Sequence, residues 1–169
     1  MAYAFYPGCT LHSQARGFRE SVNLSAQALG IELTELPNWQ CCGAVYPLVQ
    51  DNLFPVVSAA RNLSAAAATG LPMVTVCSAC YHVHKRTNLL MAGDEEKRAK
   101  LNAFIESSYD GRGEVLHLLE ALRREVEPAA LAGKVTRPLT GLRVAAYYGC
   151  MLLRPEKELA FDDPEKPSI

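Results

Sequence analysis

Cysteine is the residue type of this sequence that is most capable of chemistry, and its six copies are unevenly spread. They form an adjacent pair, a C-x-x-C motif and two single residues: Cys41 and Cys42, Cys77 and Cys80, and Cys9 and Cys150. A buried cysteine often serves only as a small apolar residue. That role suits a lone cysteine, but it does not account for an adjacent pair together with a C-x-x-C motif. The pattern therefore indicates metal binding or thiol redox chemistry.

Charge and hydropathy exclude several classes of protein. The 169 residues contain 17 Lys+Arg and 18 Asp+Glu, a net charge of −1, whereas a nucleic-acid-binding surface normally has a basic excess. No apolar run approaches the about 18 residues of a transmembrane helix, and the N-terminus lacks the basic region of a secretory signal. We therefore expect a cytoplasmic protein with no transmembrane segment and no nucleic-acid partner, in a compartment where structural disulfides are disfavoured.

The elements that must position the cysteines alternate along the chain. Short apolar runs that end at turn residues predict strands at 2–6, 31–36, 72–76 and 142–147. Helical periodicity and capping residues predict helices from Ser13 to Gly30, from Asn52 to Gly70, from Cys77 towards Leu90, and over 94–105 and 114–126, with a connector at 128–141. This alternation predicts an α/β fold, with an open, Rossmann-like parallel sheet, flanking helices and right-handed crossovers.

Each of the first three predicted strands is followed by cysteines. Cys9 follows the first strand, Cys41 and Cys42 follow the second, and Cys77 and Cys80 follow the third. The carboxyl ends of parallel strands lie along one edge of a sheet, where ligands bind. We therefore expect these five thiols to meet in one crevice.

The ligand pattern favours iron–sulfur chemistry over zinc. Structural zinc sites take four ligands, usually from two C-x-x-C motifs, whereas this chain has one such motif, an adjacent pair and a lone cysteine. Thiolates in this number suit an iron–sulfur cluster. Two alternatives remain open. One is a cluster-free dithiol/disulfide oxidoreductase, because a strand running into C-x-x-C at a helix start is also thioredoxin-like. The other is a zinc-stabilised assembly module.

Three strings of the sequence carry a resemblance to a known family. They are YPGC at 6–9, WQCCG at 39–43 and CSACY at 77–81, with 31 residues between Cys9 and Cys41 and 34 residues between Cys42 and Cys77. In these strings and this spacing the chain resembles the cysteine-rich CCG domain found in the B subunit of heterodisulfide reductase. The same domain recurs in iron–sulfur subunits of glycolate oxidase, lactate-utilisation proteins and anaerobic glycerol-3-phosphate dehydrogenase, which places it in anaerobic metabolism among other settings.

The resemblance implies a cofactor and a reaction. It implies that one noncubane [4Fe–4S] cluster is ligated by five cysteines: Cys9, Cys41, Cys42, Cys77 and Cys80. It further implies a disulfide-reducing oxidoreductase that acts in a multisubunit complex on a small-molecule disulfide or thiol, or that relays electrons. No G-x-G-x-x-G follows any predicted strand, so the sequence carries no flavin or nicotinamide fingerprint. Electrons would come from a partner protein that, by the same resemblance, carries cubane iron–sulfur clusters.

A second copy of the first motif begins near the end of the sequence. AAYYGC at 145–150 echoes AFYPGC at 4–9. Because family members carry two CCG domains in tandem, the resemblance implies a first domain at 1–141, with 142–169 as the first strand and start of a truncated second domain. Cys150 would then be a spare thiol, and this chain alone would be inactive.

The histidines after the C-x-x-C motif are weak catalytic candidates. His82 and His84 are two residues apart on a predicted helix, so their side chains point in different directions. One of them could donate a proton to a nascent thiolate, since histidine titrates near neutrality. A hydrogen-bonded structural histidine is the competing interpretation, as it is for His12 and His117. Trp39, next to the adjacent cysteine pair, is expected to shield the site from water.

Overall fold

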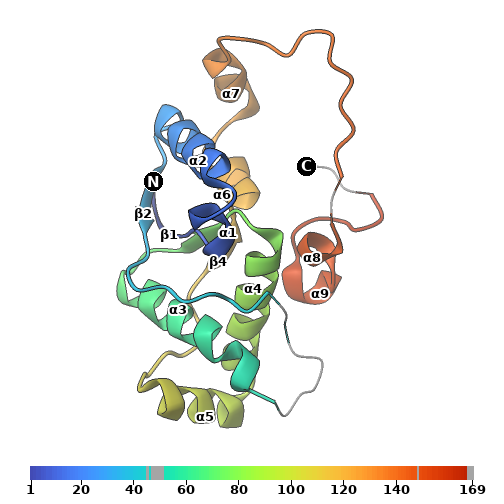
Figure 1. Ribbon diagram of the computed structural model, residues 1–169. Helices are drawn as coiled ribbons and strands as arrows, with labels where there is room; N and C mark the ends of the chain where they lie inside the picture. The colour runs from blue at the N-terminus through green and yellow to red at the C-terminus, as the bar shows by residue number, and fades with distance from the viewer. Residues whose placement is uncertain (45, 47–51, 148, 167–169) are drawn as a thin grey trace.

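The computed structural model of the chain describes residues 1–44, 46, 52–147 and 149–166. It contains a four-stranded, all-parallel sheet with helices on both faces, which confirms the predicted α/β class (Figure 1). In the order β2-β1-β3-β4, the strands are β2 (Glu32–Glu35), β1 (Ala2–Tyr6), β3 (Met73–Thr75) and β4 (Val115–His117). In chain order, the helices are α1 (Cys9–His12), α2 (Arg16–Ala28), the 3-10 helix η1 (Phe54–Val56), α3 (Val57–Ala68), α4 (Ser78–Gly93), α5 (Glu95–Ile105), α6 (Leu118–Glu125), α7 (Pro128–Lys134), α8 (Cys150–Leu153) and α9 (Glu156–Leu159).

Alternate side chains of β1 enter two separate cores. Tyr3 and Phe5 lie in the core that the sheet shares with α2 and α6. Ala4 and Tyr6 lie in the larger core on the opposite face, with α3, α4 and α5. This division follows from the two-residue period of a strand, and it places α2 and α3 on opposite faces of the sheet (Figure 1).

One of the four predicted strands is wrong. Residues 142–147 are exposed and irregular, and the fourth strand is instead β4, within the segment 114–126 that periodicity assigned to a single helix. The three residues of β4 are all buried and run directly into α6, so a short strand and a helix share one apolar pattern. Residues 142–147 have no neighbouring strand among the described residues, and a strand gains stability only from such pairing.

Neither of the two predicted capping residues is the N-cap of its helix. The helix predicted from Ser13 begins at Arg16 as α2, and Ser13 instead ends α1, where its hydroxyl donates to the carbonyl of Cys9. Asn52 precedes the N-cap of its segment, which is Leu53 at the start of η1, although its Oδ1 accepts from the N–H of Phe54 at 3.2 Å. The predicted connector 128–141 contains the short helix α7.

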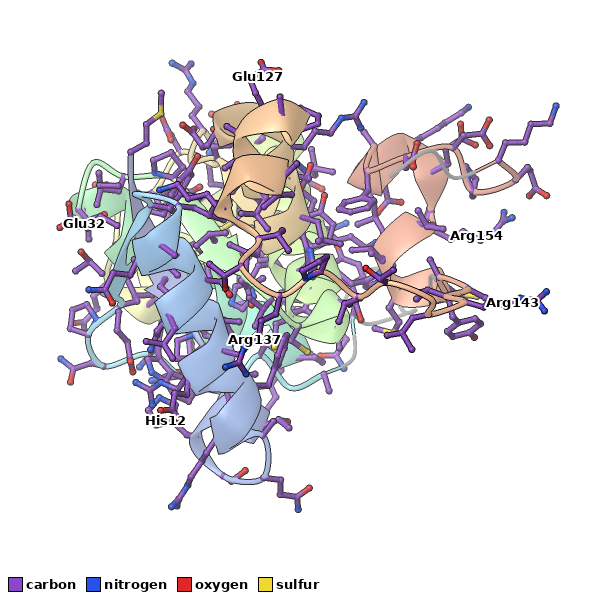
Figure 2. The ribbon with its side chains drawn as sticks, turned by 90° about the horizontal axis from the view of Figure 1, so that it is seen from above. His12, Glu32, Glu127, Arg137, Arg143 and Arg154 are labelled. Atoms are coloured by element: carbon purple, nitrogen blue, oxygen red, sulfur yellow. The ribbon has the colours of Figure 1, made fainter. Side chains whose placement is uncertain are left out.

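The C-terminal segment, which contains α8 and α9, packs against α4 on the side of the molecule away from α2 (Figures 1 and 2). Its side chains Leu152, Leu153, Leu159 and Phe161 are buried in the core that contains α4. The hydroxyl of Tyr81 donates to the carbonyl of Leu159 at 3.1 Å. Residues 152–161 thus share a core with the first predicted domain, and the division between 141 and 142 stays a prediction. Among the described residues, no helix is both long and apolar enough to cross a bilayer.

Candidate functional site

The carboxyl ends of β1, β2 and β3 deliver the cysteines to one edge of the sheet, as predicted. Cys9 is the first residue of α1, and only Pro7 and Gly8 separate it from the end of β1. Cys77 is the N-cap of α4, so Cys80 lies in the first turn of that helix. β1 and β3 are neighbours whose following helices α2 and α4 lie in different cores, which is the arrangement of a topological switch point. The thiols therefore lie at the edge where open parallel sheets bind their ligands.

The sulfur atoms meet in pairs across this edge. Cys41 Sγ lies 3.8 Å from Cys9 Sγ, and Cys42 Sγ lies 3.4 Å from Cys80 Sγ. The second pair is buried, whereas Cys9 and Cys41 are exposed. The site is thus walled by protein on the side of Cys42 and Cys80 and open on the other side.

Cys150 is not part of this group. It is exposed at the start of α8 and makes no sulfur–sulfur contact in the described part of the chain. Its role as a spare thiol stays a prediction, with which this position agrees.

Gly8 allows the first loop to approach the helix that bears Cys80. Its backbone has φ 76° and ψ 163°, a region that glycine alone adopts readily. A Cβ on this residue would lie 3.0 Å from Cys80 Sγ. The glycine in YPGC is therefore required both by the turn and by the space next to the sulfur.

The surroundings lower the pKa of two thiols, Cys42 and Cys77, and raise the pKa of two others, Cys41 and Cys80. The Cys80 thiol and the backbone N–H groups of Cys80 and Ala79 lower the pKa of Cys77 to about 6, against the opposing effect of burial. The pKa of Cys42 is lowered to about 7 by the Cys80 thiol and then by the N–H of Ala44, which lies 3.4 Å from its sulfur. Contacts with both of these sulfurs raise the pKa of Cys80. Thiolate is the form that binds soft metals, so Cys42 and Cys77 are the best prepared ligands.

The two candidate histidines are engaged by protein groups. His84 is fully buried, its Nδ1 donates to the Cys80 carbonyl at 2.8 Å, and burial lowers its pKa to about 4. His82 is half-buried, and its Nδ1 lies 3.2 Å from the carbonyl of Met151. Burial and the Arg86 charge lower the pKa of His82. These surroundings fit the structural interpretation of His84, while a proton-donor role for His82 stays a prediction.

A polar cluster beside Cys9 was not singled out from the sequence. Glu35, at the end of β2, lies 3.0 Å from His12 Nε2, and it accepts from Trp39 Nε1 at 3.1 Å and from Arg19. The Trp39 ring is half-buried and packs 5.5 Å from the ring of Tyr6, which agrees with its predicted place beside the site. His12 lies on the side of the molecule opposite Arg154 (Figure 2). Only the position of Glu35 at a strand end could have drawn attention to this cluster.

Among the residues that the structure describes, no group of three or more His, Cys, Asp or Glu side chains is placed to hold a single metal ion. The fit of an iron–sulfur group rests instead on the donor set. Five thiols lie at one edge, two of them have a lowered pKa, and glycine replaces any side chain that would crowd Cys80. Soft sulfur donors in this number suit iron–sulfur ligation.

Comparison with known proteins gives a family match to the segment that carries the five cysteines and relatives that match nearly the whole chain. Residues 3–84, which include all five of these cysteines, match the family described as CCG, cysteine-rich domain. The chain is 39% identical over 169 residues to the 8-methylmenaquinol:fumarate reductase membrane anchor subunit of Wolinella succinogenes, covering 98% of this chain and 58% of that protein. It is 30% identical over 168 residues to the B subunit of the ferredoxin/F(420)H(2)-dependent CoB-CoM heterodisulfide reductase of Methanosarcina acetivorans, covering 97% and 56%. A protein of Archaeoglobus profundus described as similar to the heterodisulfide reductase B subunit is 29% identical over 177 residues, covering 99% and 58%. The chain thus spans less than two thirds of the length of each relative.

Proposed function

Because residues 3–84 match the family described as CCG, cysteine-rich domain, we propose that this chain is an iron–sulfur redox subunit of a heterodisulfide reductase-like complex. The observation that carries the proposal is the meeting of five thiols at the carboxyl edge of the sheet: four lie in two sulfur pairs 3.8 and 3.4 Å apart, and the fifth, Cys77, interacts with Cys80. The relatives from Methanosarcina acetivorans and Archaeoglobus profundus support the heterodisulfide reductase assignment.

The cofactor in this proposal is one noncubane [4Fe–4S] cluster, held by Cys9, Cys41, Cys42, Cys77 and Cys80. Such a cluster supplies a Lewis-acidic iron and accepts one electron at a time. The protein contributes two thiols with lowered pKa values, Cys42 and Cys77, so that few protons must be displaced when they become ligands. Gly8 keeps the space beside Cys80 free.

The substrate would approach from the open side of the site. Cys9 and Cys41 are exposed there, whereas Cys42 and Cys80 are buried behind them. A small-molecule disulfide can reach the exposed side without any rearrangement of the core. By the family resemblance, electrons would come from a partner protein with cubane clusters. The echo of YPGC at 147–150 supports a second copy of the motif that opens with Cys150.

A second candidate function is electron relay without disulfide chemistry. The 39% identity to a subunit of a quinol:fumarate reductase favours it, because that value exceeds the 30% identity to the heterodisulfide reductase relative. The two functions differ in a direct assay of the assembled complex. Oxidation of a reduced viologen that depends on added disulfide supports the first function. Reduction of fumarate by a quinol, with no thiol released, supports the second.

Removal of single thiols tests the cofactor. We expect the anaerobically reconstituted chain to show broad absorbance near about 400 nm with stoichiometric iron and sulfide. Cys41→Ser should lose iron and change the spectrum, whereas the control Cys150→Ser should do neither. A colourless protein with one zinc would overturn the iron–sulfur proposal. A Cys41→Ser protein with unchanged iron and spectrum would refute the five-ligand set.

A further inference from the structure

Asn62 is a buried polar residue in the middle of α3, and it belongs to none of the cysteine motifs. Its exposed fraction is 1%, so each of its side-chain hydrogen-bonding groups must find a protein partner. Oδ1 accepts from the N–H of Gln40 at 2.8 Å. Nδ2 donates to the carbonyl of Gln40 at 2.8 Å and also lies 3.1 Å from His84 Nε2. Asn62 therefore binds both backbone groups of the residue that precedes the adjacent cysteines.

The hydrogen positions in this group follow from its backbone partners. A backbone N–H can only donate and a carbonyl can only accept, so the two bonds to Gln40 determine which atom of the Asn62 amide is oxygen. The carbonyl of Cys80 likewise requires that His84 carry its proton on Nδ1. His84 Nε2 is then the acceptor for the second N–H of Asn62. Each hydrogen bond that links Gln40, Asn62, His84 and Cys80 therefore has one donor and one acceptor.

These bonds connect the two halves of the cysteine site. One half is the loop that carries Cys41 and Cys42, and its residues 37–44 make no backbone-to-backbone hydrogen bond to another described residue. The other half is the first turn of α4, which carries Cys80. The path runs from the backbone of Gln40 through Asn62 and His84 to the carbonyl of Cys80.

Tyr6 reinforces the same path. Its hydroxyl donates to the Gln40 carbonyl at 2.9 Å, and its ring centre lies 4.4 Å from that of His84. Tyr6 is fully buried, as is His84, so the connection is protected from competition by water. β1, α3 and α4 thus each provide one side chain to it.

We propose that Asn62 is a positioning residue that holds the Cys41–Cys42 loop in place relative to Cys80, through Gln40 on one side and His84 on the other. The use of these cysteines as ligands rests on the proposed function, but the holding of the loop does not. Among the described residues Asn62 makes no hydrogen bond to a sulfur atom, and it acts through the backbone of Gln40 and the ring of His84.

The test compares Asn62→Leu with a matched control in the full chain. Asn88, on α4 about two turns beyond Cys80, is also a nearly buried asparagine, and it donates to the carbonyl of Gly113 at 2.8 Å. Asn88→Leu should therefore lower the free energy of unfolding about as much as Asn62→Leu does, without affecting the edge of the sheet where the cysteines lie. The primary measurement is amide hydrogen exchange at Gln40 in the iron-free protein.

We expect Asn62→Leu to accelerate exchange at Gln40 by at least about tenfold, the factor that corresponds to one lost buried hydrogen bond, and Asn88→Leu to leave it unchanged. After reconstitution, Asn62→Leu should bind less iron per folded chain and show an altered absorption spectrum, while Asn88→Leu should match the wild type. If Asn62→Leu does not fold, Asn62→Ala replaces it, because alanine has a high helix propensity. The same acceleration of exchange at Gln40 is then expected.

Two outcomes overturn the proposal. One is unchanged exchange at Gln40 in the folded Asn62 variant, and the other is equal acceleration in Asn88→Leu. Because exchange is measured without iron, its result is separate from the fate of the cluster. A wild-type chain that takes up no iron would refute the proposed function while leaving the role of Asn62 to be judged from exchange at Gln40.

Discussion

At the scale of single residues, the edge of the sheet where the five cysteines lie depends on neighbouring residues whose side chains are not reactive. Gly8 is one of these, because its φ of 76° and ψ of 163° suit glycine and its missing side chain leaves room for Cys80 Sγ. The two effects are separable, since Gly30 also has a positive φ, 74°, but a Cβ added there would meet no atom within 4 Å. A pair of alanine substitutions therefore distinguishes backbone strain from crowding at the sulfur.

We expect Gly8→Ala to destabilise the chain by about 1–3 kcal/mol and to reduce iron bound per folded molecule. Gly30→Ala should cost about 1 kcal/mol and leave iron binding unchanged. Urea unfolding measures the first quantity, and iron analysis of the reconstituted proteins measures the second. Wild-type iron content in Gly8→Ala would show that crowding beside Cys80 is unimportant.

At the scale of elements, the short strand β4 and helix α6 meet at His117, whose ring serves both. Nδ1 accepts from the N–H of Leu119 at 3.3 Å, and Nε2 donates to the carbonyl of Val76 at 3.2 Å. Glu120 completes a capping box by accepting from the backbone N–H of His117. The ring must be neutral for this arrangement, because a protonated Nδ1 cannot accept.

Burial lowers the pKa of His117 below its usual 6.5, although the bond to Val76 opposes the shift. The unfolded chain therefore binds more protons below that pH, and folding stability falls as the pH falls. His117→Asn keeps a favoured helix-capping residue but does not titrate. We expect its free energy of unfolding to fall less steeply between pH 7 and pH 5, by at most about 1.4 kcal/mol per pH unit. Parallel pH profiles for the two proteins, measured by urea unfolding, would contradict this role.

At the scale of the whole molecule, the segment that follows the exposed stretch 142–147 packs against α4, the helix that carries Cys80. Arg86 of α4 pairs with Glu158 of α9 and lies 4.0 Å from the ring centre of Tyr46, so it touches both the C-terminal segment and the chain beyond the adjacent cysteines. Leu159 is fully buried in the core that also contains Cys42 and Cys80. The two parts should therefore unfold together.

Leu159→Ala tests this cooperativity. We expect it to destabilise the chain by about 2–5 kcal/mol, because it opens a cavity in the shared core. Leu139→Ala, at a position that is 74% exposed, should change stability by less than about 0.5 kcal/mol. The fluorescence of Trp39, the only tryptophan of the sequence, reports unfolding beside the cysteine edge. A Trp39 transition that does not shift in Leu159→Ala would mean that the C-terminal segment folds separately.

Local patterns in the sequence were sufficient for the α/β class and for the location of the five cysteines. Strand-to-helix alternation is written in short periodic runs, and parallel strands necessarily bring their carboxyl ends to one edge. The same local patterns misassigned β4 and 142–147, because whether a short apolar run becomes a strand depends on a neighbour distant in sequence.

The tertiary structure alone decided which sulfurs pair, that Asn62 and His84 join the two halves of the site, and that Leu159 completes the core. Each of these depends on contacts between residues that lie tens of positions apart in the sequence: Cys42 and Cys80, Gln40 and Asn62, Tyr81 and Leu159. A buried polar residue such as Asn62 looks like any helical asparagine in the sequence, and only its surroundings show that all of its hydrogen bonds are used. The sequence by itself therefore determined which groups could do chemistry and at which edge, while the packing of α3 and α4 on β1 decided how those groups are held.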